Sequence, residues 1–509
     1  MSKVLFIVVL LLFYFQSHSQ HIFDRQYYDS ILNSQNNFQR CNAVLQTTDG
    51  GFLACGVGNM GAKISSIKFN SQGDTIWSFV ADIALNRSEY LIATTEASDS
   101  NYLVVGYSGD QILSKSHADL IKLNKDSGDT IWVRRIGLPN RSERFYNVKK
   151  TIDNGIILSG LRYNVDSSNT TTDSDVYLVK TDSSGIVEWE QTFGGIGYEW
   201  GQSLEIADDG GFMVFGSTNS YGVGSYDAYL IKTDPNGNMQ WQKTFGVQYV
   251  DYGGSITKLQ NGDYILAGSS IITSDSAIAV AIRINAEGTE IWNRRYPPTV
   301  RSMEFTAVKQ LSSGEIMVTG SDQGDTLNNS FYGILKSLDL NNGDIIWERQ
   351  YHLFEDDSTQ HYLYSMDTCS DGGLVMGGMI IDRRGINSIV GNSYWVVKTD
   401  CAGNEYVWDN DACPKFVSLD EIEKDALFNL YPNPSTGAVT LDYFIPQNAE
   451  NQSISLYDAT GKLVQKVDFT GEGQIQLNID CSGFSNGVYQ CVLVSDGEVL
   501  QQGKLVVIK

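Results

Sequence analysis

One unit recurs along most of this chain, and a repeat of nearly fixed length restricts the possible folds more than composition does. Residues 226–246 read YDAYLIKTDPNGNMQWQKTFG, and residues 174–194 already read SDVYLVKTDSSGIVEWEQTFG. Seven copies align by a glycine in one apolar strand and by a later tryptophan, the tryptophans being 51 to 61 residues apart. The glycines are Gly56, Gly106, Gly160, Gly216, Gly268, Gly320 and Gly378, and the tryptophans are Trp77, Trp132, Trp189, Trp241, Trp292, Trp347 and Trp408.

Each copy contains about four short alternating segments separated by glycine turns, and no segment with a helical period. Four strands per repeat are typical of a β-propeller blade, whereas a parallel β-helix has shorter repeats. The sequence therefore predicts an all-β protein with a seven-bladed β-propeller over residues 20–413. The segment FDRQYYDS from Phe23 resembles the outer strand WERQYHLF from Trp347. We expect this N-terminal strand to pair into the last blade and close the ring.

A basic residue and the tryptophan hold a fixed register in the repeat. The turn in KTDPNGNMQW places Lys232 opposite Trp241, and the same count holds for Lys68, Lys180 and Arg283. A cation over an indole contributes roughly 0.5–1 kcal/mol at an exposed site. We interpret the pair as a strut repeated with the blade, in preference to a set of sugar-binding tryptophans.

The N-terminus and the charge indicate an exported protein. Lys3 precedes an apolar run from Val4 to Phe15, and Ser17-His18-Ser19 offers a cleavage site, so residues 1–19 are predicted to be a signal peptide. No later apolar run approaches the length of a transmembrane segment. The formal net charge is −24 without any basic run, which argues against nucleic acid or an anionic membrane as a partner.

The last eighty or so residues differ from the repeats. Residues 414–426, PKFVSLDEIEKDA, carry no repeat signature and are predicted to be a linker. Residues 427–509 then carry several motifs in order. These motifs are Tyr431-Pro432-Asn433-Pro434, Leu456-Tyr457-Asp458, Gly487-Val488-Tyr489 and Gly503-Lys504-Leu505-Val506-Val507. This segment resembles the C-terminal sorting domain of proteins exported by the type IX secretion system of the Bacteroidota.

The turn chemistry of this segment agrees with a small β-sandwich, because short strands alternate with Asn-Pro, Thr-Gly and Asp-Gly turns. The resemblance implies the type IX secretion machinery as a partner. It also implies a secreted or outer-membrane surface location, with removal of the sorting domain after transport.

The seven cysteines all follow the signal segment, in an exported chain where disulfides persist. Cys401 and Cys413 bracket the end of the repeats and are expected to pair. Cys41 and Cys55 are symmetric about a turn, and Cys481 and Cys491 are placed similarly, so both are candidate disulfides; Cys369 is left over.

No sequence motif identifies a catalytic centre. Gly56-Val57-Gly58-Asn59-Met60-Gly61 matches a dinucleotide-binding pattern, but no helix follows it, and the histidines lack metal-ligand spacing. Gly483-Phe484-Ser485-Asn486-Gly487 matches a nucleophile elbow without the strand-to-helix step. The sequence favours a non-catalytic module that binds glycan or protein, with a polysaccharide or a surface protein as the expected partner. The alternative is a glycan hydrolase or lyase with two carboxylates converging at one mouth of the ring.

One candidate site follows from the register. Glu89, Glu143, Glu199 and Asp251 occupy one position at the start of the innermost strand in four consecutive blades. Gln39, His361 and either Met303 or Glu304 are the equivalents elsewhere. Such carboxylates form an acidic arc around one channel mouth if they face the channel. Two interpretations remain: each binds backbone amides of the neighbouring blade and holds the ring together, or the arc binds calcium or the cationic part of a ligand. No other cofactor is expected.

Overall fold

The computed structural model describes the following parts of the chain: residues 23–27, 39–58, 63–81, 87–110, 115–138, 141–165, 170–273, 276–324, 330–352, 359–382, 391–404, 429–431, 435–445, 452–457, 463–469, 473–495 and 498–507. These residues form strands and turns and contain no helix. Contacts divide the chain into two units, Gln20–Cys413, here called the propeller unit, and a second that contains the described residues 429–507. The predicted signal peptide and linker lie outside the described residues. Within those residues, no helix has the length and apolar character needed to span a membrane.

The described part of the propeller unit contains five separate four-stranded antiparallel sheets, each made of four strands consecutive in the chain. Their strands are β2 (Arg40–Gln46), β3 (Phe52–Gly58), β4 (Lys63–Phe69) and β5 (Thr75–Ala81); β6 (Arg87–Glu96), β7 (Tyr102–Asp110), β8 (Lys115–Leu123) and β9 (Thr130–Ile136); β10 (Glu143–Lys150), β11 (Ile156–Val165), β12 (Thr171–Thr181) and β13 (Val187–Phe193); β14 (Glu199–Ile206), β15 (Phe212–Thr218), β16 (Asp227–Thr233) and β17 (Met239–Phe245); β18 (Val250–Lys258), β19 (Tyr264–Thr273), β20 (Ser276–Ile284) and β21 (Glu290–Tyr296).

A further eight-stranded sheet consists of two such four-stranded groups joined by a single parallel pair, Phe331 with Gln360. Its strands are β22 (Met303–Gln310), β23 (Ile316–Gln323), β24 (Phe331–Leu338) and β25 (Ile345–Tyr351), followed by β26 (Thr359–Thr368), β27 (Leu374–Asp382), β28 (Gly391–Thr399) and β1 (Phe23–Tyr27). β1 pairs antiparallel with β28, Phe23 opposite Lys398, so the prediction that the N-terminal strand joins the last group is confirmed.

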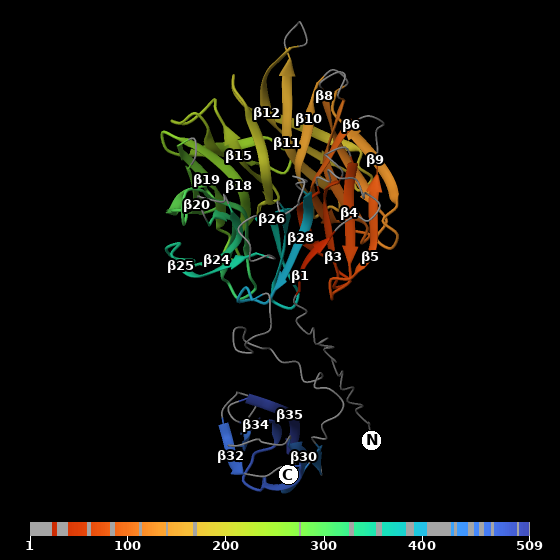
Figure 1. Cartoon of the computed structure of the whole chain (residues 1–509), viewed down its shortest axis with the longest axis vertical. Coiled ribbons are helices and arrows are strands. Elements are labelled where there is room, and N and C mark those ends of the chain that lie inside the picture. The colour runs from red at the N-terminus through yellow and green to blue at the C-terminus, as the bar shows by residue number, and fades with distance from the viewer. Residues whose placement is uncertain are drawn as a thin grey trace, which may run out of the picture. The chain divides into compact units, whose positions relative to one another are not determined.

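The first strands of the groups form the inner wall of the unit. Each of β2, β6, β10, β14, β18, β22 and β26 contacts the next, and β26 contacts β2, so these strands close into a ring. All-β structure built from four-stranded sheets around a common axis is consistent with a β-propeller (Figure 1). Each four-stranded group is called a blade below.

The expected strut is present, but its partner differs from the prediction. The register is confirmed, since Lys232 lies opposite Trp241. The ammonium group, however, turns to the aspartate of the turn between the first two strands, and Lys232 Nζ lies 2.7 Å from Asp209 Oδ2. The same pairing recurs as Lys68–Asp49, Lys122–Asp99, Lys180–Asp153, Arg283–Asp263 and Lys398–Asp371. The predicted cation–indole contact is therefore wrong for these residues. The buried cation binds a carboxylate instead, because a carboxylate is a charged hydrogen-bond acceptor.

The tryptophans instead connect neighbouring blades. Gly237, in the turn between β16 and β17, has φ +80°, and a Cβ there would lie 2.7 Å from Trp189 Cζ3 in the preceding blade. Only glycine fits both the left-handed backbone and this approach. The same contact recurs as Gly128 on Trp77, Gly185 on Trp132, Gly288 on Trp241, Gly343 on Trp292 and Gly403 on Trp347. Trp408 lies outside the described residues.

The described part of the second unit has two sheets that share one core. The three-stranded sheet contains β29 (Asn429–Tyr431), β30 (Ala438–Ile445) and β33 (Gly473–Asp480). The four-stranded sheet contains β32 (Leu463–Phe469), β31 (Gln452–Tyr457), β34 (Gly487–Ser495) and β35 (Glu498–Val507). Leu441 and Ile479 of the first sheet pack with Ile454 and Leu493 of the second in a single buried cluster.

Two of the three expected disulfides are absent, because Cys41, Cys55, Cys481 and Cys491 are buried free thiols. An irregularity between Cys41 and Ala43 shifts the hairpin register, so Cys41 lies opposite Gly56 and Ala43 lies opposite Cys55. Burial raises the pKa of the Cys41 and Cys491 thiols to about 12. Cys369, the cysteine left over, is also free. Cys401 is disulfide-bonded, and Cys413, its expected partner, lies outside the described residues.

Candidate binding site at the mouth of the central cavity

A shared irregularity determines which side chains of the innermost strands face inward. In β10, Glu143, Phe145 and Val148 are buried, whereas Arg144 and its alternate neighbours are partly exposed. A bulge interrupts the pairing with the second strand at the same place in all seven innermost strands. It falls between Cys41 and Ala43, Leu91 and Ala93, Phe145 and Asn147, Gly201 and Ser203, Gly253 and Ser255, Phe305 and Ala307, and Leu363 and Ser365. Because a bulge adds one residue, the strand turns and two consecutive residues lie beside the cavity.

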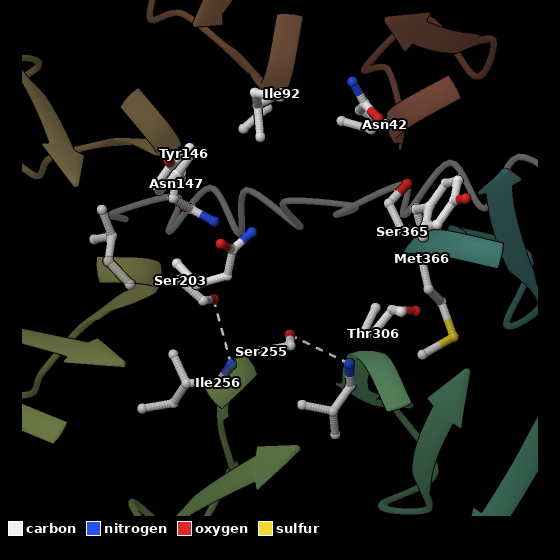
Figure 2. Close-up of a pocket in the computed structure, with 18 of the residues that line it drawn as sticks. Asn42, Ile92, Tyr146, Asn147, Ser203, Ser255, Ile256, Thr306, Ser365 and Met366 are labelled. Carbon is white, nitrogen blue, oxygen red and sulfur yellow. Dashed lines mark hydrogen bonds between the residues drawn. The ribbon is translucent and has the colours of Figure 1, made fainter. Parts of the chain in front are cut away.

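The innermost strands surround a central cavity of about 910 Å³. Figure 2 shows side chains from several of these strands around it, among them Asn42, Tyr146, Ser255 and Thr306. The lining falls into three layers along the strands: one before the bulge, one at it and one after it. The layers have different roles.

The middle layer joins neighbouring strands. Ser203 Oγ accepts a hydrogen bond from Ile256 N at 3.3 Å, and the bond from Val308 N to Ser255 Oγ is equivalent (Figure 2). Between the last and first blades, Ser365 Oγ accepts from Val44 N at 2.8 Å. These bonds satisfy edge amides that have no strand partner, so this layer stabilises the ring.

The layer after the bulge consists largely of paired charges. Lys149 Nζ lies 2.7 Å from Glu205 Oε1, and Lys309 Nζ lies 3.1 Å from Asp367 Oδ1. Asp367 raises the pKa of Lys309. Since these charges bind one another across neighbouring blades, they also hold the ring and offer little to a ligand.

The layer before the bulge is different, because large aromatic and charged side chains gather in it and next to it. We call seven of these cavity-lining residues the mouth ring. Arg40, Trp200, Tyr252 and Glu304 stand before the bulge, Tyr146 and Tyr364 are the bulged residues of their strands, and Tyr107 comes from the second strand β7. All seven are partly exposed. Side chains of this kind present apolar faces together with polar tips, which is typical of binding surfaces.

Aromatic contacts organise the mouth ring. Trp200 lies 5.5 Å from Tyr226 and 5.9 Å from Tyr252, ring centre to ring centre, and forms an aromatic platform with them. On another part of the ring, Tyr107 stacks with Tyr90 at 4.9 Å. The guanidinium carbon of Arg144 lies 4.5 Å from the centre of the Tyr107 ring, a cation–π distance.

Arg40, Tyr364 and Glu304 come from three consecutive blades. The guanidinium carbon of Arg40 lies 5.3 Å from the centre of the Tyr364 ring. Its Nε is buried and has no hydrogen-bond partner. Burial raises the pKa of the Tyr364 phenol. The positive charge of Arg40 acts to lower this pKa, and the carboxyl group of Glu304 acts to raise it further. Burial also raises the pKa of the Glu304 carboxyl. The mouth therefore holds a cation and a carboxyl group separated by a tyrosine.

The predicted acidic arc does not lie in this mouth. Glu89, Glu143, Glu199 and Asp251 are between 0% and 4% exposed, and none of them lines the cavity. They stand one residue before the layer that does, on the opposite face of the strand. The four carboxylates therefore do not face the cavity, and calcium binding by them stays a prediction. The equivalents Gln39, Met303 and His361 are buried as well, and His361 packs edge-on against Trp395 at 5.2 Å.

Three of the four carboxylates accept hydrogen bonds from backbone amides close by in the chain, whereas the other interpretation expected amides of the neighbouring blade. Glu199 accepts from Gly195 N at 2.9 Å, Asp251 from Val247 N at 2.8 Å, and Glu143 from Leu138 N at 3.2 Å. The amides belong to the loop that enters the same strand. Glu143 also lies 3.3 Å from Arg162 Nε, yet burial raises the pKa of Glu143. Across the described ranges, no group of three or more His, Cys, Asp or Glu residues is arranged to hold a metal ion.

Solved structures of several kinds resemble the chain with low identity. They include a fungal alcohol oxidase in complex with copper (12% identity, 93% of this chain and 99% of that chain, TM-score 0.43). They also include an α-L-arabinofuranosidase of Fusarium graminearum (13% identity, 60% of this chain and 91% of that chain, TM-score 0.41). A third is an ulvan lyase (11% identity, 72% of this chain and 94% of that chain, TM-score 0.43). With every one of these TM-scores below 0.5, we draw no conclusion from these likenesses. No curated protein matches the chain.

Two family models match parts of the chain. Residues 153–376 match the one described as outer membrane protein assembly factor BamB. Residues 429–509 match the one described as secretion system C-terminal sorting domain, over the segment where the motifs predicted it. The C-terminal part of this chain is therefore a sorting domain of that family, as expected of a protein exported by type IX secretion.

Proposed function

We propose that this is an exported protein whose sorting domain directs type IX secretion and whose propeller unit is a non-catalytic module that binds glycan or protein at the mouth ring. The unit is then a seven-bladed propeller, and the second unit a β-sandwich. The closed series of innermost strands and the β1–β28 pairing support the blade count. The two sheets around one core support the sandwich.

The mouth ring is the observation that carries the binding function. Its residues surround a cavity large enough for a small ligand, since binding pockets commonly measure about 300–1,000 Å³. Aromatic rings supply apolar stacking surface, and Arg40 and Glu304 supply polar contacts. The middle layer of the cavity holds the strands together with small side chains such as serine. A purely structural role would therefore not require the large, half-exposed aromatic side chains of the mouth ring.

The charges at the cavity favour binding over hydrolysis. A carboxylate-dependent glycosidase needs two carboxyl groups roughly 5–10 Å apart at the scissile bond. Among the described lining residues, Glu304 is the carboxylate of the mouth layer, whereas Glu205 and Asp367 are ion-paired beyond the bulge. A hydrolase or lyase remains the alternative, and turnover of a bound glycan by the purified protein would establish it.

Export is tested by intact-mass measurement on protein recovered from the native culture. The surface or secreted form is expected to lack about the first nineteen residues and the segment from about residue 427. Deletion of the last eighty residues is expected to leave the propeller unit in the periplasm. Secreted material that retains Lys509 contradicts this processing.

Binding is tested with the purified protein on a glycan array and in a pull-down from surface extracts. Trp200→Ala combined with Tyr252→Ala removes the aromatic platform and is expected to weaken binding at least ten-fold. Ile152→Ala, at a position 98% exposed and outside the cavity lining, is the control. Equal binding by both variants places the site elsewhere.

A further inference from the structure

We propose that the mouth ring recognises a glycan with an isolated acidic sugar residue, with Arg40 holding its carboxylate or sulfate group and the aromatic platform stacking on another sugar of the same glycan. This inference rests on the proposed binding function and names the ligand class. It is carried by the charges of the cavity, by the geometry around Arg40 and by the position of the platform.

Most charged residues of the cavity bind a partner within the protein, whereas Arg40 and Glu304 form no ion pair within the described residues. Seven charged residues line the cavity. Lys149 pairs with Glu205 and Lys309 with Asp367. Glu96 accepts a hydrogen bond from Thr48 Oγ1 at 2.7 Å. Arg40 and Glu304 remain, both in the mouth layer, and neither forms an ion pair within the described residues.

Arg40 is placed to receive an anion. Its guanidinium lies against the Tyr364 ring and also donates a hydrogen bond to that side chain. A guanidinium carries five N–H donors, so others remain for a ligand. Its Nε is buried without an acceptor, so an anion in the cavity meets the terminal N–H groups of the guanidinium instead. Carboxylate and sulfate groups match the paired donors of a guanidinium in geometry and charge. Arg144, stacked on Tyr107, adds a second cation at the rim.

The aromatic platform lies away from Arg40 around the ring. Arg40 is on β2, whereas Trp200 and Tyr252 are on β14 and β18, three or more innermost strands away along the ring in either direction. A sugar ring presents C–H groups to an aromatic face and hydroxyls at its edge. A sugar stacked on the platform therefore places an acidic residue elsewhere in the same glycan at Arg40, across the cavity, and Glu304 accepts hydrogen bonds from glycan hydroxyls.

The charge of the whole chain limits the ligand further. A protein of net charge −24 repels a densely charged polyanion at long range. A single acidic residue on an otherwise neutral glycan avoids most of this repulsion and still reaches Arg40. Heavily sulfated polymers and nucleic acids are therefore disfavoured.

The test compares oligosaccharides of equal length by calorimetry on the full chain. One series carries a single uronate, a second carries a single sulfate, and a third is neutral. We expect at least one acidic series to bind ten-fold or more tightly than the neutral one. The stronger of the two acidic series identifies the group as carboxylate or sulfate.

Variants assign the preference to Arg40. Arg40→Gln is expected to abolish the preference for acidic sugars and leave neutral binding within two-fold, while Arg40→Lys retains part of it. Arg294→Gln, an exposed arginine on the outer strand β21, removes the same charge outside the cavity and is expected to change nothing. Unchanged melting temperatures show that the variants are folded.

The outcomes separate this inference from the proposed function. Equal affinity for neutral and acidic sugars, unchanged in Arg40→Gln, overturns the acidic-sugar inference and leaves glycan binding in place. Tighter binding of a heavily sulfated polymer than of a singly charged glycan also overturns it. If no glycan binds and a surface protein does, the glycan part of the proposed function fails together with this inference.

Discussion

Lys398 Nζ lies 2.8 Å from Asp371 Oδ2, and the two side chains are only 1% and 7% exposed. In the equivalent pair, Lys232 is 7% exposed and Asp209 is 48% exposed. The Lys398–Asp371 salt bridge is therefore buried, whereas in the equivalent salt bridge of β16 the aspartate is about half exposed to water. The blade of β28, which β1 completes, contains the buried one.

This difference predicts unequal costs for the same substitution. Asp371→Asn leaves a buried ammonium without its counter-ion, which costs about 3–5 kcal/mol of unfolding free energy. Asp209→Asn leaves an ammonium that water reaches through an exposed turn, so its cost is expected near that of an exposed pair, about 0.2–1 kcal/mol. Urea denaturation of both variants measures the two costs. Equal values would show that burial of the aspartate does not matter.

The contact between glycine and tryptophan gives a second prediction with a matched control. Gly237 and Gly372 have φ +80° and +84°, but a Cβ at Gly372 has nothing within 4 Å, whereas one at Gly237 meets Trp189. Both alanine variants carry the left-handed backbone cost of about 1–2 kcal/mol. Gly237→Ala adds overpacking of about 1–3 kcal/mol. Thermal unfolding should therefore rank Gly237→Ala well below Gly372→Ala, and a reversed order contradicts the inter-blade contact.

Acid should weaken the struts in a defined range of pH. A hydrogen bond from Thr151 and the ammonium of Lys180 lower the pKa of Asp153 to about 2. An unfolded aspartate titrates near pH 3.9, so this depressed pKa contributes stability that is complete above roughly pH 4 and is lost as the pH falls toward 2. The melting temperatures of the wild type and Asp153→Asn are expected to differ at pH 6 and to converge near pH 2. A constant difference over this range would exclude the linkage.

Binding of an acidic sugar should also depend on pH, through Glu304. Burial raises the pKa of this carboxyl, and the titratable group that interacts with it is the phenol of Tyr364. Protonation removes a negative charge from the mouth, so affinity for an acidic sugar is expected to rise as the pH falls through the pKa of Glu304. In Glu304→Gln the affinity should be high and nearly independent of pH between 5 and 8. Titration calorimetry at several pH values checks both statements.

The repeat made the architecture predictable, whereas the mouth was missed by one residue. Glycine and tryptophan registers indicated four strands per unit, and the likeness between FDRQYYDS and an outer strand indicated the closing role of β1. The same register drew attention to Glu143 and Glu199, whose charges stand out in sequence. Strand side chains alternate with a period of two, so a one-residue difference exchanges the faces. Trp200 directly follows Glu199, and Arg40 and Glu304 directly follow the equivalent residues Gln39 and Met303. These three following residues line the cavity.

Other features depended on geometry that no local pattern carries. The bulge after Cys41 moves Cys55 out of register with it, and the bulge has no single residue signature. The salt bridges of the turn aspartates Asp49 and Asp209 to Lys68 and Lys232 reach across a whole hairpin, so no local pattern indicates them. Both features concern side chains whose partners depend on a strand irregularity or on a non-local contact.

The pairing of β1 with β28 has a kinetic consequence. Phe23 pairs with Lys398, so the last ladder of the propeller unit joins its two ends. Loop closure over so long a segment is slow, and such pairing forms after local hairpins have folded. Until then, β28 presents an open edge that other chains can join. During export, therefore, the chain passes through an interval in which every blade but one is complete, and secretion factors that delay or shield that closure would act on this single seam.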